Sequence, residues 1–118
     1  MSHPTRRLDP TIHQPTRLGI LTAAAQVKRI DFVSLRDLLD VTDGNLSRHL
    51  TTLESAAYIE IEKTFEGRKP RTWIAATPAG RKALAAEIAA LREIVGDADS
   101  RSAAPKRSPR TATVRPAD

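Results

Sequence analysis

The residue types best suited to chemistry lie together in one stretch of the chain, from Thr42 to Ala56. On a helix, where successive residues turn by about 100°, its leucines share one side, while an arginine, an amide and several hydroxyls share the other. Arginine pairs with guanine, amides pair with adenine, and hydroxyls bond to phosphate oxygens. The outward-facing residues that we expect to contact double-stranded DNA are Gly44, Asn45, Ser47, Arg48, Thr51 and Thr52.

The alternative for this stretch is a polar face that only meets solvent. Surface helices usually mix lysine with glutamate, whereas this outward face has no acidic residue. Gly44 is a poor helix residue, which costs up to ~1 kcal/mol relative to alanine. Its missing side chain would, however, let the start of the helix approach a phosphate backbone closely. These points favour DNA contact.

A second group of cations lies around a predicted hairpin turn, where Gly67 and Pro70 supply the bend. Three cations in four positions are more than a turn needs, although a solubilising loop is the alternative. We expect this turn to contact the DNA backbone or an adjacent minor groove. Its cations are Arg68, Lys69 and Arg71, and Lys63 on the preceding strand is a further candidate for a phosphate contact.

Other kinds of chemistry find little support. The chain has no cysteine, which excludes disulfides, thiolate metal sites and a cysteine nucleophile. His3, His13 and His49 are too scattered for a metal-ligand set. Ser47 and His49 would diverge by about 200° on one helix, so they cannot form a nucleophile–base pair. The sequence therefore predicts a protein that is not an enzyme and needs no cofactor or metal.

Hydrophobic periodicity predicts the elements that position these residues. The expected order is helix, short strand, helix, helix, hairpin and helix. This is a mainly α fold with a β-hairpin wing (α+β), a winged helix-turn-helix, in which the second helix of the pair enters the major groove. We expect helices at about residues 14–27, 34–39, 42–56 and 78–95, a short strand at 31–33, and hairpin strands at 58–65 and 71–75.

Composition sets the limits of the folded part. A chain of 118 residues supports one domain. Residues 1–9 are polar and are expected to be a flexible N-terminus, and residues 10–95 carry the periodic pattern. Residues 96–118 contain three prolines, one large apolar residue and a net charge of +2, and are expected to be a disordered basic tail.

The net charge of +5 attracts polyanions only weakly. No apolar run is long enough to span a membrane, and the N-terminus lacks the apolar stretch of a signal peptide. These features predict a cytoplasmic protein.

The motifs resemble those of a known family of bacterial regulators. Residues 47–53, which read Ser-Arg-His-Leu-x-x-Leu, are similar to the ArsR type of winged-helix regulator. Residues 63–72 and 77–81 resemble small MarR-like winged-helix DNA-binding domain proteins. The resemblance covers about residues 9–95 and implies a dimeric transcriptional regulator, in which each subunit places one recognition helix in successive major grooves. A small-molecule effector is a further partner that it allows.

In such families the first and last helices pair two subunits. The last predicted helix has a line of apolar residues, and its far end extends past a small helical core. The line could instead be satisfied by the core of its own subunit. The expected dimer-interface residues are Leu84, Ile88, Leu91, Ile94 and Val95.

One position departs from the family pattern. Family members usually carry glycine just after the recognition helix, where a left-handed residue ends it. This chain has Ala56 and Ala57 there, and alanine in that conformation costs about 1 kcal/mol or more. The helix could therefore end differently.

Two functions follow from these features. The first is a sequence-specific DNA-binding transcriptional regulator. The second is a winged-helix protein-interaction or nucleoid-associated architectural protein that binds DNA with little sequence preference. Base readout separates the two.

Overall fold

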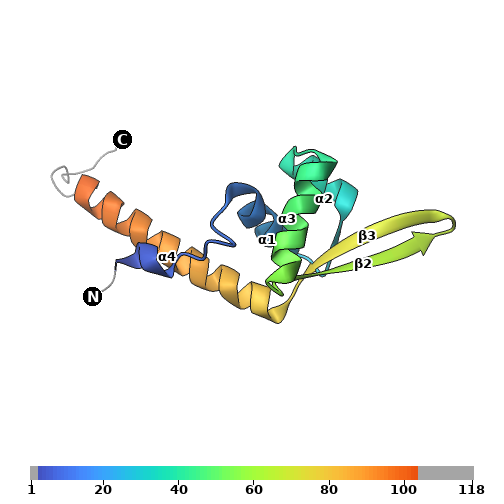
Figure 1. Cartoon of the computed structure of the whole chain (residues 1–118). Helices are drawn as coiled ribbons and strands as arrows, with labels where there is room; N and C mark the ends of the chain where they lie inside the picture. Colours follow the sequence, from blue (N-terminus) through green and yellow to red (C-terminus); the bar gives the residue numbers. More distant parts are fainter. Residues whose placement is uncertain (1–2, 104–118) are drawn as a thin grey trace, which may run out of the picture.

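The periodic segments of the sequence form helices and an antiparallel sheet in the computed structural model, which describes residues 3–103 (Figure 1). The helices are α1 (Pro15–Ala25), α2 (Phe32–Leu39), α3 (Asp43–Ser55) and the long α4 (Pro78–Ala103), preceded by a 3₁₀ turn, η1 (Pro4–Arg7). The strands are β1 (Ile30–Asp31), β2 (Ile59–Glu66) and β3 (Lys69–Ala76). This is the winged helix-turn-helix order that the sequence predicts, with β2 and β3 as the wing.

The core lies where the helices and the base of the sheet meet. Leu46, Leu50 and Leu53 of α3 are almost completely buried, at 0%, 3% and 0% exposure. They share one face of the helix because they are spaced by four and three residues. The same core contains Ile12, Ile20, Leu21, Ala24, Leu35, Ile59, Ile74 and Leu84.

A short left-handed turn separates α2 from α3. Asp40 has a φ of 53°, and its N–H bonds to the carbonyls of Arg36 and Asp37 at the end of α2. Thr42 then caps α3, because its hydroxyl accepts from the N–H of Asn45 at 3.1 Å. The helix therefore starts within one residue of the position expected from the sequence.

The end of α3 keeps the left-handed residue despite the alanine. Ala57 has a φ of 64°, and its N–H bonds to the carbonyl of Glu54 at 2.9 Å. The N–H of Tyr58 reaches back to Leu53 at 3.0 Å, which completes a Schellman-type end. The absence of glycine therefore does not change where this helix ends.

The wing is a long hairpin with a tight turn. Residues Ile59 to Glu66 pair with Ala76 to Lys69, and β1 adds a short third strand along β3. Gly67 has a φ of 66°, which a glycine adopts readily. Pairing therefore continues to Glu66 and Lys69, and the turn is tighter than the 66–70 expected.

The structure also differs from the sequence prediction at the boundary between β1 and α2. The short strand lies at Ile30–Asp31 rather than at 31–33, and α2, which Asp31 caps, begins at Phe32 rather than at 34. The Asp31 carboxylate accepts from the Ser34 hydroxyl at 2.6 Å and from its N–H at 3.3 Å. The hydroxyl bond is the main cause that lowers the pKa of Asp31 below its ordinary value of 3.8.

Both ends of the chain carry more structure than their composition predicts. Within residues 1–9, expected to be flexible, η1 lies beside the middle of α4 (Figure 1). Helix α4 runs to Ala103 instead of ending near residue 95. The rest of the expected tail, residues 104–118, lies outside the described residues. No helix within residues 3–103 is long and apolar enough to cross a membrane.

The junction between β3 and α4 is closely packed. Thr77 caps α4 by accepting from the N–H of Gly80 at 2.9 Å, while its hydroxyl donates to the carbonyl of Ala57 at 2.7 Å. A Cβ atom at Gly80 would overlap the carbonyl oxygen of Tyr58. Glycine at this position lets the start of α4 lie close to Tyr58, just after the end of α3.

Candidate nucleic-acid interface

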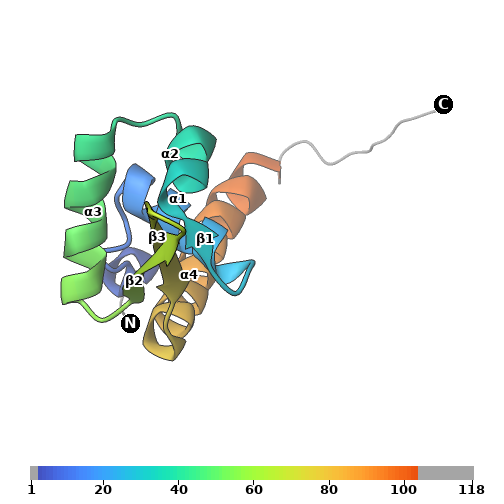
Figure 2. The same ribbon diagram turned by 90° about the vertical axis from the view of Figure 1, so that its right-hand side faces the viewer.

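Helix α3 presents a continuous polar face on the side opposite its buried leucines. It stands at one side of the molecule, and most of α4 lies on the other side (Figure 2). Asp43 and Glu54 are exposed on α3, and neither falls within the predicted contact set. Within that set, Thr52 is half-buried, whereas the exposed members are Gly44, Asn45, Ser47, Arg48 and Thr51.

The polar side chains of this face are held by their own helix. Arg48 donates from Nη2 to the amide oxygen of Asn45 at 2.7 Å. The hydroxyl groups of Thr51 and Thr52 donate to the carbonyls of Ser47 and Arg48 at 3.0 and 3.3 Å. A guanidinium has five N–H donors, so most of those of Arg48 stay available to an acceptor.

The two faces of the wing differ in chemistry. Cross-strand register places Glu60, Glu62 and Glu66 on one face, together with Lys69 and Arg71 of β3. Lys63 and Phe65 lie on the other, because side chains alternate along a strand. The acidic residues of β2 are therefore kept off the face that carries Lys63.

The face with Lys63 borders a groove against α3. The groove is lined by Ser47 and Thr51 of α3 and by Lys63 and Thr72 of the wing, over an apolar floor that includes Leu50. Hydroxyls and an ammonium group around such a groove are the donors that a phosphate oxygen accepts from.

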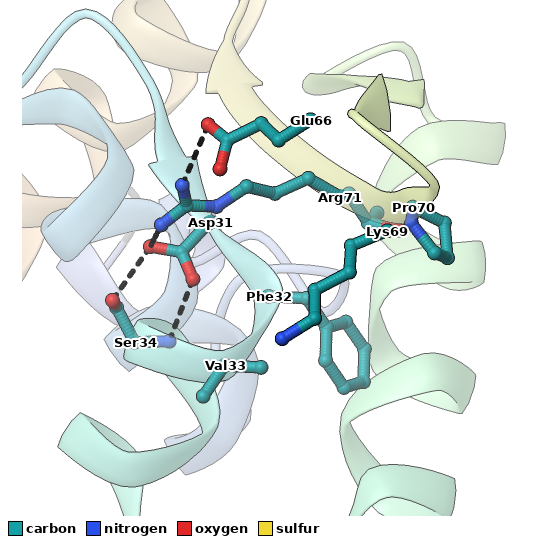
Figure 3. A pocket seen from close by; sticks show the side chains of 9 residues that line it. Asp31, Phe32, Val33, Ser34, Glu66, Lys69, Pro70 and Arg71 are labelled. Atoms are coloured by element: carbon teal, nitrogen blue, oxygen red, sulfur yellow. Dashed lines mark hydrogen bonds and ion pairs between the residues drawn. The ribbon is translucent and has the colours of Figure 1, made fainter. Parts of the chain in front are cut away.

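The three cations of the wing are not equivalent. Arg68 and Lys69 are exposed at the tip. Arg71 donates to Glu66 at 2.9 Å, lies 4.0 Å from an Asp31 carboxylate oxygen, and stacks 5.0 Å from the centre of the Trp73 ring. Figure 3 shows its guanidinium between the two carboxylates. The structure thus separates Arg71 from the other two cations.

Comparison with known proteins agrees with this geometry. The winged helix DNA-binding domain family matches residues 16–95. The chain belongs to this family. An uncharacterised protein of Methanocaldococcus jannaschii is 34% identical over 67 residues, which cover 57% of this chain and 73% of that protein.

Solved structures of regulators share the winged-helix fold. A transcriptional regulator homologue from Pyrococcus horikoshii superposes with a TM-score of 0.77 at 25% identity, over 84% of this chain and 99% of that one. A MarR-family regulator described as putative, from Enterococcus faecalis, has a TM-score of 0.64 at 24% identity, over 81% and 84% of the two chains.

In this winged-helix domain, an arginine of α1 contacts α3. Arg17 contacts Nδ1 of His49 at 3.0 Å and donates to the carbonyl of Thr11 at 2.5 Å. A guanidinium only donates, so Nδ1 of His49 accepts. Burial, followed by the charges of Arg17 and Arg48, lowers the pKa of His49 below its ordinary 6.5. His49 therefore links α3 to α1 through Arg17. No group of three or more potential metal ligands occurs within residues 3–103.

The sequence analysis did not single out one buried carboxylate of the winged-helix domain. Glu87 of α4 is fully buried. It accepts from the N–H of Asp9 at 2.8 Å and lies 2.9 Å from Nδ1 of His13. The carboxylate of Asp9 accepts from the Tyr58 hydroxyl at 2.6 Å, a bond that raises the pKa of Tyr58. The one signal in the sequence is that Glu87 lies at helical spacing between the apolar residues Leu84 and Leu91.

The predicted dimer stripe of the domain divides into two parts. Leu84 is only 6% exposed and packs in the core of its own subunit, so it leaves almost no surface for a partner. Ile88 also packs against this core. Towards the far end of α4, Leu91 and Ile94 are half-buried, and Val95 is 64% exposed.

Proposed function

We propose that this winged-helix chain is a transcriptional regulator that reads specific DNA sequences, with α3 in the major groove and the wing, residues 65–72, on the backbone or the adjacent minor groove. The observation that carries the proposal is the outward face of α3. Three buried leucines hold it in place, its contact residues include no acid, and Arg48 stands near its centre. The predicted cytoplasmic location belongs to the same proposal.

Within this proposal the residues divide their work by chemistry. Arg48 pairs with a guanine and Asn45 with an adenine, while Ser47, Thr51 and Thr52 bond to phosphates or base edges. Gly44 lets the start of α3 approach a phosphate.

The tip of the wing contributes charge. Arg68 and Lys69 neutralise phosphates, and Lys63 does so from the groove beside α3. Arg71 is proposed to hold the wing in place, since Glu66 and Asp31 already bind its guanidinium.

The test begins with a duplex selected from a random library by the purified protein. We expect Arg48→Ala to lose ~1–3 kcal/mol of discrimination at one base pair of that duplex, because a bidentate guanine contact is removed. Competition gel shifts against duplexes with single base changes measure this loss. Lys28→Ala, in the exposed loop after α1, is the matched control and should leave preference unchanged.

Changes in the wing should behave differently. Arg68→Ala and Lys69→Ala should weaken all sequences about equally and reduce the slope of log K against log salt by about 1 each. If Arg48→Ala also weakens every duplex equally, α3 does not read bases. That outcome would favour the architectural or protein-interaction function.

A further inference from the structure

The tip of the wing carries an exposed aromatic side chain that phosphate contacts do not require. Phe65 is 70% exposed, more than Val27, Val33, Leu38 or Val95, the other large apolar side chains that the described residues expose. It pairs across the hairpin with Pro70, next to the turn at Gly67. Two apolar rings therefore lie next to each other on one face of the wing, close to its tip.

The surroundings of Phe65 indicate what could cover it. Lys63 precedes it on the same face of β2, and Arg68 follows in the turn. Glu60, Glu62 and Glu66 all lie on the opposite face. Phe65 and Pro70 are thus bordered by cations, and the glutamates of β2 lie on the other face. This pattern suits a polyanion with an apolar component better than a neutral protein surface.

The position of the wing face that carries Phe65 also favours a polyanion as the molecule that covers it. At the base of the wing, Lys63 and Thr72 share a groove with Ser47 and Thr51 of α3. A duplex whose backbone lay along this groove would continue towards the tip of the wing. Its minor groove would then meet the face that carries Phe65.

We propose that Phe65, backed by Pro70, packs into the minor groove next to the site read by α3 and contacts deoxyribose and base edges there. This inference rests on the proposed function and deepens it. Apolar side chains in a minor groove favour base steps that open easily, so the contact adds sequence preference in the flank without a hydrogen bond to a base.

The test compares Phe65→Ala with Arg68→Ala on the selected duplex over a range of salt concentrations. Phe65→Ala should weaken binding on the order of tenfold, since part of a phenylalanine side chain would stay in water. Its salt slope should match that of the unaltered protein, because no phosphate contact is lost. Phe65→Leu should retain most of the affinity. Val27→Ala, which truncates an exposed apolar residue after α1, should have no effect.

Selection from a random library provides the second readout. The Phe65→Ala protein should keep the preference at the central bases and lose that at the flank. An affinity within twofold of the unaltered protein, with the flank preference intact, would overturn the inference.

A change in self-association without DNA, measured by sedimentation, would also overturn it, because the ring would then serve a second copy of the chain. The proposed function is tested separately by Arg48→Ala, which does not change the wing. Thermal melting should be unchanged in the Phe65 variants, since the side chain is mostly in water.

Discussion

Ala57 shows how a single residue can oppose the structure that surrounds it. It holds a left-handed conformation, which costs a residue with a Cβ atom roughly 1–2 kcal/mol. The bonds from the N–H groups of Ala57 and Tyr58 to the last turn of α3 depend on this conformation. Capping and the close junction with α4 therefore outweigh the local preference of alanine.

Ala57→Gly should raise the free energy of unfolding by up to about 1 kcal/mol. Relief of the left-handed strain exceeds the extra entropy that glycine gives the unfolded chain. Urea denaturation followed by circular dichroism measures the change. Ala56→Gly is the matched control. Ala56 has a φ of −83°, so glycine relieves no strain there and should lower the free energy of unfolding. Equal losses in the two variants would contradict the strain at Ala57.

At the scale of elements, one buried carboxylate links the N-terminal segment, residues 3–14, to the last helix. Glu87 of α4 binds the backbone of Asp9 and the ring of His13, and Asp9 binds Tyr58 directly after α3. An exposed ion pair between Arg7 and Glu93 adds a surface contact between the segment and α4. The segment thus connects the last helix with the end of the recognition helix.

Glu87→Ala should lower the free energy of unfolding by about 1–3 kcal/mol, because the N–H of Asp9 loses its partner in a buried site. Glu87→Gln should lose less, since its amide oxygen can still accept. Chemical denaturation measures stability, and amide exchange at Asp9 reports on the segment itself.

Glu93→Ala is the control for this prediction and should cost at most about 1 kcal/mol, as exposed ion pairs do. A loss in Glu87→Ala no larger than that in Glu93→Ala would show that the buried network does not hold the segment.

For the whole molecule, the length of α4 bears on assembly. The helix extends away from the wing and projects beyond the other helices (Figure 1). Leu84, near the start of α4, packs in the core of the subunit, whereas Val95 is exposed to solvent. We propose that a second copy of the chain covers Leu91, Ile94 and Val95, with Ile88 at the margin.

Leu91→Asp should convert the proposed dimer to a monomer, because a charge would be buried at the proposed interface. Sedimentation over a range of concentrations measures the mass. Ala89→Asp, an exposed position about 200° away around α4, is the control and should leave the dimer intact. A symmetric dimer also predicts two half-sites roughly 34 Å apart, whereas footprinting of one unrepeated half-site would contradict it.

The sequence predicted most of α3 because the determinants of this helix are local. The spacing of Leu46, Leu50 and Leu53 selects the buried face, and Thr42 caps the helix three residues before the N–H it binds. Alternation along 59–66 likewise separates the two faces of the wing. Such patterns depend on helix and strand geometry alone, so they can be read without knowing the neighbours.

Tertiary structure alone decided which charges are free and which are bound. Arg71 looks equivalent to Arg68 in the sequence, but the pairing of β1 with β3 brings Asp31 to it from forty residues away. Glu87 looks like a surface acid until Asp9 and His13 fold over it. The charge of a side chain is a property of its type, whereas its availability depends on non-local groups that meet only when the chain has folded.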